Sequence, residues 1–112
     1  MAPLRIYRID AFTTTAGEGN PAGVVTDARG LSDARMQAIA RDLGHSETAF
    51  VLPPRGEDHD IHVRFFSPAV EVPVCGHATV GAHYALALEG GERGTRRQLT
   101  GAGVQHVDTR ED

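Results

Sequence analysis

The feature that most constrains this chain is an apolar stretch, Ala78 to Leu88, which directly follows the motif Cys75-Gly76-His77. The stretch is apolar or small on every side except at His83, and a helix that is hydrophobic all round belongs in a protein core. We therefore predict a core helix whose first turn opens inside the protein. Its unpaired N–H groups and partial positive charge favour a bound carboxylate. The sequence thus indicates a binding site for a small organic acid.

Composition and charge exclude several classes of protein. With 112 residues, the chain is expected to form one domain with a modest core. The net charge of −4 and the lack of a basic patch argue against nucleic acid as the main partner. No apolar run reaches the roughly 18 residues of a membrane helix and no signal-peptide pattern is present, so we expect a cytoplasmic protein. All 11 basic residues are arginine, so this chain alone cannot form a Schiff base through lysine.

Local patterns predict the remaining elements. One helix is expected between an N-cap at Ser32 and a terminating glycine at Gly44. Apolar side chains recur between them at helical spacing, at Met36, Ile39, Ala40 and Leu43. Strands are expected at 4–12, 23–26, 47–52, 60–66 and 70–74, with a final hairpin from 96–100 and 104–107 around Gly101 and Gly103. The alternation within 60–66 indicates a half-buried strand. The whole is predicted to be an α+β fold, a curved, mostly antiparallel sheet holding one apolar helix.

Glu47 is the first candidate for chemistry. It follows the helix-ending Gly44 closely and begins an apolar strand. A carboxylate at such a mouth can have its pKa raised by partial burial and act as a general acid or base. The alternative is a solvated glutamate in a loop.

Cys75 and His77 flank Gly76 at the start of the apolar helix. The helix dipole is expected to lower the pKa of the Cys75 thiol and favour the thiolate, which is a nucleophile or a proton-abstracting base. A small buried apolar residue is the alternative for Cys75. His77 can donate a hydrogen bond to a bound acid or carry a proton, or it can be a histidine satisfied within the core. His83 is predicted to be structural.

A metal site is not predicted. His59 and His62, together with Asp58 and Asp60, superficially suggest a cluster of metal ligands. Positions i and i+3 of a strand face opposite ways, however, so the two histidines are not expected to share a metal ion.

Several sequence blocks together resemble one known family, the PhzF phenazine-biosynthesis-like isomerases, which have the diaminopimelate-epimerase fold. The blocks occur in the family's order and spacing across nearly the whole chain. They are Asp10-Ala11-Phe12, Gly19-Asn20-Pro21-Ala22-Gly23-Val24-Val25, Ser46-Glu47-Thr48-Ala49-Phe50, Arg64-Phe65-Phe66-Ser67-Pro68 and the segment from Glu71 to Thr79 that contains Cys75-Gly76-His77-Ala78-Thr79.

The resemblance implies a cofactor-free enzyme of two similar halves, each a sheet rolled around a central helix, with a small carboxylic or amino acid bound between them. It assigns to Glu47 the movement of a proton between carbons of the substrate, and to His77 the positioning of substrate and the relay of protons. Cys75 occupies the place of a catalytic base in the epimerase branch of the fold. Contacts with substrate are implied for Asn20 and for the helix start, at Gly76, His77, Ala78 and Thr79.

Residues 1–112 resemble only the N-terminal half of that family, as a single half-domain. The opposing wall of the cleft is then expected from a second half-domain subunit, or from a second copy in a homodimer. A non-catalytic binding or scaffold subunit that keeps the acid pocket is the alternative function, and a fragment of a longer protein is a further alternative. Glu47 is favoured over Cys75 as the main base, because its Ser-Glu-Thr-Ala-Phe context matches the isomerase branch.

Overall fold

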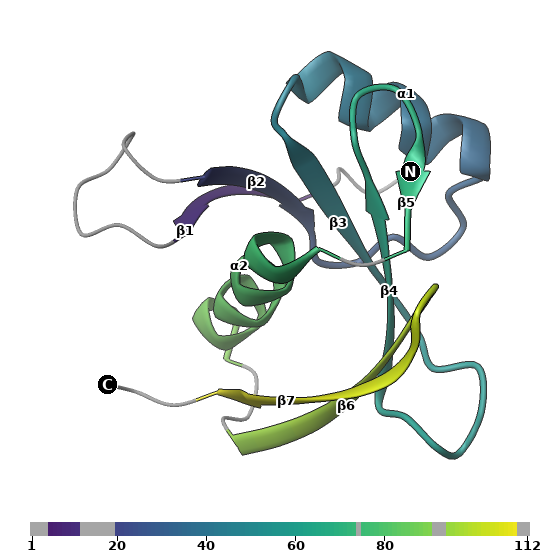
Figure 1. Ribbon diagram of the computed structural model, residues 1–112, viewed down its shortest axis with the longest axis vertical. Coiled ribbons are helices and arrows are strands. Elements are labelled where there is room, and N and C mark those ends of the chain that lie inside the picture. Colours follow the sequence, from purple (N-terminus) through teal and green to yellow (C-terminus); the bar gives the residue numbers. More distant parts are fainter. Residues whose placement is uncertain (1–4, 12–19, 74, 91–93, 110–112) are drawn as a thin grey trace.

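The computed structural model describes residues 5–11, 20–73, 75–90 and 94–109, which form one mixed sheet and two helices (Figure 1). In chain order the elements are β1 (Ile6–Ala11), β2 (Asn20–Val25), α1 (Asp33–Leu43), β3 (Glu47–Leu52), β4 (Ile61–Phe66), β5 (Glu71–Val72), α2 (Gly76–Leu88), β6 (Gly94–Thr100) and β7 (Gly103–Thr109). The predicted α+β class is confirmed.

The strand order in the sheet is β1-β2-β3-β4-β6-β7, with the short β5 paired to β4. Four of the described pairings are antiparallel, but β2–β3 and β4–β6 are parallel. Parallel neighbours need a long crossover connection, and here α1 lies between β2 and β3 in sequence while α2 lies between β4 and β6. The sheet is therefore mixed, with antiparallel pairings in the majority as predicted.

Helix α1 forms where its capping residues predict it. The Ser32 hydroxyl accepts a hydrogen bond from the backbone N–H of Arg35 at 3.1 Å, which satisfies one of the free donors of the first turn. Gly44 ends the helix in the left-handed conformation with φ of 69°, and its N–H donates to the carbonyl of Ala40.

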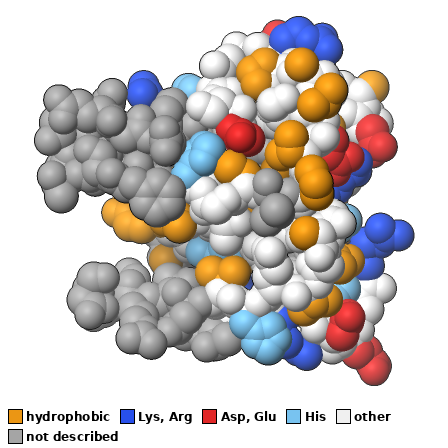
Figure 2. Space-filling model, viewed as in Figure 1, with side chains coloured by type: hydrophobic (Ala, Val, Ile, Leu, Met, Phe, Trp, Pro, Cys, Tyr) orange, Lys and Arg blue, Asp and Glu red, His pale blue; other side chains and the backbone are white. Residues whose placement is uncertain are grey.

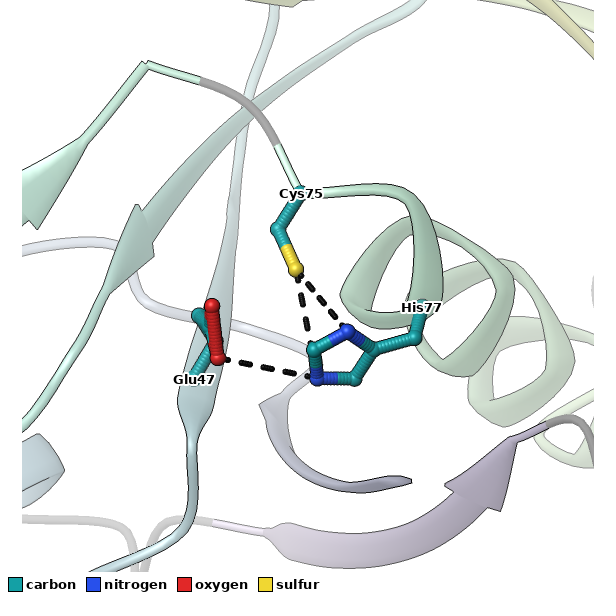
Figure 3. A group of neighbouring side chains, drawn as sticks. All are labelled: Glu47, Cys75 and His77. Atoms are coloured by element: carbon teal, nitrogen blue, oxygen red, sulfur yellow. Dashed lines mark hydrogen bonds and ion pairs between the residues drawn. The ribbon is translucent and has the colours of Figure 1, made fainter. Parts of the chain in front are cut away.

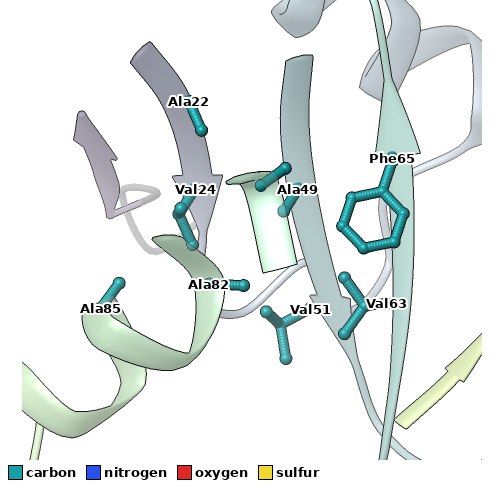
Figure 4. Packing of buried hydrophobic residues seen from close by; sticks show 9 residues of the cluster. Ala22, Val24, Ala49, Val51, Val63, Phe65, Ala82 and Ala85 are labelled. Atoms are coloured by element: carbon teal, nitrogen blue, oxygen red, sulfur yellow. The ribbon is translucent and has the colours of Figure 1, made fainter. Parts of the chain in front are cut away.

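Two apolar clusters fill the two sides of the sheet. The first lies between the sheet and α2, and Figure 4 shows its side chains converging from β2, β3, β4 and α2. The second lies under α1 and includes Met36, Ile39 and Phe50. Strand β4 serves both, because Val63 and Phe65 enter the first cluster and Phe66 the second. The prediction of a half-buried strand was therefore wrong at its C-terminal end, where helices cover both faces.

Helix α2 begins at Gly76, two residues before the apolar stretch, and packs with Ala78, Ala82 and Ala85 fully buried. The packing is close: a Cβ on Gly81 would lie 3.3 Å from the Cβ of Ile9. Figure 1 shows α2 with β1 and β2 on one side and β6 and β7 on the other.

The opposite stripe of α2 is exposed, which corrects the prediction of a helix buried all round. Val80, Tyr84 and Leu88 expose 47%, 53% and 58% of their surface, at a spacing that places them on one side of the helix. Figure 2 shows that hydrophobic side chains reach the surface at several places on the face viewed.

The remaining differences concern element ends. Strand β2 begins at Asn20 rather than Gly23, and the turn of the last hairpin is formed by Gly101 and Ala102. Some predicted segments lie outside the described residues. They are the terminal strand residues 4, 12 and 74, residues 13–19, and residues 91–93. Neither helix in the described part of the chain is long and apolar enough to cross a membrane.

Candidate active site

The structure brings together the three residues predicted to carry chemistry, although they come from two separate parts of the sequence. Glu47 is the first residue of β3, Cys75 is the N-cap of α2, and His77 lies in the first turn of α2. The parallel pairing of β2 with β3, which places Glu47 opposite Ala22, fixes the start of β3. Figure 3 shows the three side chains pointing toward one another.

The imidazole of His77 lies between the other two groups. Its Nδ1 is 3.1 Å from the Cys75 Sγ, and its Nε2 is 3.6 Å from Oε2 of Glu47 (Figure 3). The side chains of His77 and Glu47 are only 14% and 22% exposed. An acid, an imidazole and a thiol are thus in contact range in a largely desolvated place.

One atom of this cluster lacks a hydrogen bond. The Oε2 atom of Glu47 is buried and makes no hydrogen bond with the described residues, although it lies in the 3.6 Å ion pair with Nε2 of His77. Buried polar atoms almost always have a hydrogen-bond partner, so this oxygen can still accept a hydrogen bond at the site.

The prediction that the helix start lowers the pKa of the Cys75 thiol was wrong. Burial raises the pKa of Cys75, and the negative charge of Glu47 raises it further. The backbone N–H groups of Ala78 and His77 act in the opposite direction, as expected of a helix start, but they do not prevail. The thiol form is therefore favoured in this structure.

The other residues predicted to contact substrate differ in how accessible they are. The Gly76 backbone is exposed, whereas Ala78 is fully buried and can offer only its backbone. The Thr79 hydroxyl already donates to the carbonyl of Cys75 at 2.8 Å. For Asn20 the structure describes the backbone in β2 but not the side chain.

A buried polar chain behind the site was not foreseen from the sequence. Gln98 of β6 is fully buried; its Oε1 lies 2.9 Å from Nε2 of His83, and its amide donates to Thr79 at 3.4 Å. His83 is thus held in the core beside β6, as the structural interpretation of this residue predicted. The i, i+4 spacing of Thr79 and His83 was a usable signal, because it places both on one face of the helix.

His59 has another role. His59 is buried, with Nδ1 2.6 Å from a carboxylate oxygen of Asp58 and Nε2 accepting from the backbone N–H of Arg55. Both ring nitrogens are therefore engaged in ordering the 53–60 loop. Within the described ranges, the one group of three potential metal ligands whose donor atoms lie within 4.8 Å is Glu47, Cys75 and His77.

The fold and the site together define an α+β protein with an acid–imidazole–thiol cluster at the start of a helix packed against the sheet. The chain belongs to the PhzC-PhzF family, because the family model described as phenazine biosynthesis-like protein matches residues 9–112. This family membership confirms the resemblance seen in the sequence blocks.

Relatives and solved structures agree with this assignment. The chain is 53% identical over 104 residues to an uncharacterized isomerase of Clostridium acetobutylicum, covering 92% of this chain and 34% of that protein. It is 58% identical over 83 residues to the uncharacterized isomerase YddE of Escherichia coli K12, covering 74% of this chain and 27% of that protein. The crystal structure of a PhzF-family phenazine biosynthesis protein from Bacillus anthracis superposes with a TM-score of 0.89 at 40% identity, covering 100% of this chain and 38% of that one. A predicted epimerase from Pseudomonas aeruginosa has a TM-score of 0.74 at 31% identity, covering 86% and 34%.

The chain spans about a third of the length of these relatives. The matched part is their N-terminal part.

Proposed function

We propose that this chain is the N-terminal part of a PhzF-like, cofactor-independent isomerase that moves a proton on a small carboxylic or amino acid. Glu47 takes a proton from one carbon of the substrate and returns it to another. His77 holds the substrate and relays the proton, and the N–H groups at the start of α2 bind the substrate carboxylate. Residues 1–112 then form one half-domain in which the sheet rolls around α2.

The observation that carries this proposal is the pairing of the Glu47 carboxylate with His77 at 3.6 Å in a largely desolvated place. A carboxylate and an imidazole in that relation can exchange a proton through a bound substrate or one bridging water. The names of the relatives, isomerase and predicted epimerase, support the same reaction class.

We assign Cys75 the secondary role. Its raised pKa keeps the thiol protonated, and a protonated thiol is a poor base at neutral pH. Two-base epimerisation also needs a second base across the substrate, and this chain has only one cysteine.

The proposed active site is completed by a second half-domain, on a separate chain or in a second copy. The exposed stripe of Val80, Tyr84 and Leu88 begins one turn from the site and supports this view, because contiguous exposed apolar surface marks an interface. Because the chain matches about a third of its relatives, a continuation of the same polypeptide is an equally suitable source of the second half.

The second candidate function is a binding subunit that keeps the acid pocket without turnover. The absence of a hydrogen bond at Oε2 of Glu47 favours neither function, because a bound ligand and a reacting one can both supply it. Exchange of the carbon-bound hydrogens of an acid for deuterium separates the isomerase from the binding subunit. We would incubate the protein, alone and co-expressed with its genomic neighbours, with a panel of amino acids and other small carboxylic acids in heavy water, and follow the carbon-bound protons by NMR.

The isomerase predicts loss of one carbon-bound proton signal from at least one acid, at a rate proportional to protein concentration. Binding of an acid, seen by saturation transfer, without exchange in any assembled state would contradict the isomerase and favour the binding subunit.

A further inference from the structure

We propose that Glu71 and Gly101, which lie outside the acid–imidazole–thiol cluster, are positioning residues for that cluster. They hold the connection between β5 and α2 from two sides. The connection ends at Cys75, the N-cap of α2, so its position decides how the helix start presents Cys75 and His77 to Glu47.

Strand β5 is tied to the sheet mainly by a side chain. It has only two residues, and among the described strands it pairs with β4 alone. The carboxylate of Glu71 accepts two hydrogen bonds from Arg64 of β4, from Nε at 2.8 Å and from Nη2 at 2.7 Å. Such a two-pronged contact fixes the orientation of both groups, so it holds β5 in place just before the connection.

The guanidinium of Arg64 is itself held on other sides. Its Nη1 donates to a carboxylate oxygen of Asp33, the first residue of α1, at 2.7 Å, and it lies 5.4 Å from the centre of the Phe66 ring. Arg64 therefore joins β5 to both β4 and α1. The Asp33 contact leads to α1 rather than to the connection, so Asp33 provides a matched control for Glu71.

Gly101 holds the connection from the side of the β6–β7 hairpin. A Cβ at Gly101 would lie 2.9 Å from the Cα and 3.3 Å from the carbonyl oxygen of Pro73, which is two residues before Cys75. Only glycine allows two backbone segments to approach this closely. An alanine at position 101 must therefore displace either the turn of the hairpin or the connection.

The thiol of Cys75 reports the position of the connection. Burial raises the pKa of Cys75, and the charge of Glu47 raises it further. If the connection loosens, the thiol gains water and moves away from the carboxylate, so its pKa falls toward the ordinary value. Because the thiolate is the form that reacts with alkylating reagents, the pH profile of alkylation follows this change.

The test is the rate of alkylation of Cys75 by iodoacetamide as a function of pH. For Glu71→Ala and Gly101→Ala we expect the midpoint of the profile to fall by at least about half a pH unit, which raises the rate at pH 7 about threefold. The controls are Asp33→Ala and Gly56→Ala, a loop position where a Cβ would have its nearest contact at 3.6 Å. Both should keep the midpoint of the unmodified chain.

Global destabilisation alone does not move this midpoint while the chain stays folded, which circular dichroism checks. Exposed ion pairs contribute little to overall stability, so Glu71→Ala should fold. Glu71→Gln, which keeps the shape of the side chain, is the second variant. Unchanged midpoints in the folded Glu71 and Gly101 variants would overturn the proposal, as would an equal shift in Asp33→Ala and Glu71→Ala.

The effect on catalysis rests on the proposed function. In the active assembly, Glu71→Ala and Gly101→Ala should slow deuterium incorporation at least about tenfold, because a displaced catalytic group loses rate steeply, while the two control variants keep the rate. Full exchange rates in both positioning variants would count against the proposal. If the unmodified assembly exchanges no acid, the proposed function fails by itself, and the alkylation profiles still decide whether Glu71 and Gly101 position Cys75.

Discussion

The protonation of Cys75 and of His83 depends on a competition between burial and the charged or polar groups nearby. At Cys75 the N–H groups of a helix start favour the thiolate, yet burial and the carboxylate of Glu47 prevail and keep the thiol. At His83 burial also prevails: it lowers the pKa of the imidazole, although the hydrogen bond to Gln98 favours the charged form. These outcomes depend on which groups surround the side chain, which is why the contact between Glu47 and Cys75 could not be foreseen from their separate sequence motifs.

His83 gives a pH dependence of stability with a defined sign. Its pKa is lowered in the folded state from the ordinary value of 6.5, so below that value the unfolded chain binds a proton that the folded chain does not. Stability is therefore full above about pH 6.5 and falls as the pH decreases toward the folded-state pKa. We expect His83→Gln to reduce the difference in free energy of unfolding between about pH 8 and about pH 5, measured by urea denaturation.

Two comparisons make this prediction sharp. His106→Gln, at an exposed position, should leave the pH dependence as in the unmodified chain. Burial also lowers the pKa of His62, so part of the dependence should persist in His83→Gln. An identical dependence in His83→Gln and the unmodified chain would show that His83 is not buried in the neutral form.

At the scale of elements, the two helices differ in whether local sequence signals or packing against other elements specifies them. Helix α1 is specified locally, by the Ser32 cap, the apolar spacing and Gly44, and its prediction is confirmed. Helix α2 is specified by the elements that cover it, and its apolar stripe of Val80, Tyr84 and Leu88 is exposed in this chain.

The two glycines next to the helix ends test the local account. At Gly44, with φ of 69°, an alanine Cβ would meet nothing within 4 Å, so Gly44→Ala should cost only backbone strain, about 1 kcal/mol in the free energy of unfolding. A Cβ at Gly76 would also meet open space, but Gly76 lies in a helical conformation, so Gly76→Ala should be neutral or stabilising by up to about 1 kcal/mol. Chemical denaturation measures both, and equal effects of the two changes would contradict this account.

The fold was predictable where the evidence in the sequence was local and less so where it was not. The bounds of β3 were predicted to the residue, because the apolar run that ends at Leu52 is stopped by Pro53 and Pro54. The parallel pairing of β4 with β6 was not predicted, because it joins segments more than thirty residues apart in the sequence. The three site residues were each identified by motif, but their mutual contact depends on the pairing that sets the start of β3.

At the scale of the whole molecule, the exposed stripe on α2 predicts association. If a second half-domain covers the stripe, Val80→Arg and Leu88→Arg should each weaken the assembly at least about tenfold, because a charge would be buried without a partner. Each should change the stability of the chain alone by less than about 0.5 kcal/mol. Val70→Arg, at a residue 57% exposed outside α2, is the matched control.

Light scattering of the chain, alone and co-expressed with its genomic neighbours, measures this association. A strictly monomeric chain under both conditions would contradict the assembly, as would arginine variants that associate as well as Val70→Arg.

The central claim is that Glu47 moves the proton and that Cys75 does not. The most direct measurement is the rate of deuterium incorporation from heavy water into the exchanging acid, in the active assembly, for Glu47→Gln, Cys75→Ala and the exposed control Glu57→Gln. We predict a loss of at least about 100-fold for Glu47→Gln, much of the rate retained for Cys75→Ala, and no change for Glu57→Gln. The opposite ranking, with Cys75→Ala inactive and Glu47→Gln active, would contradict the account and make Cys75 the main base.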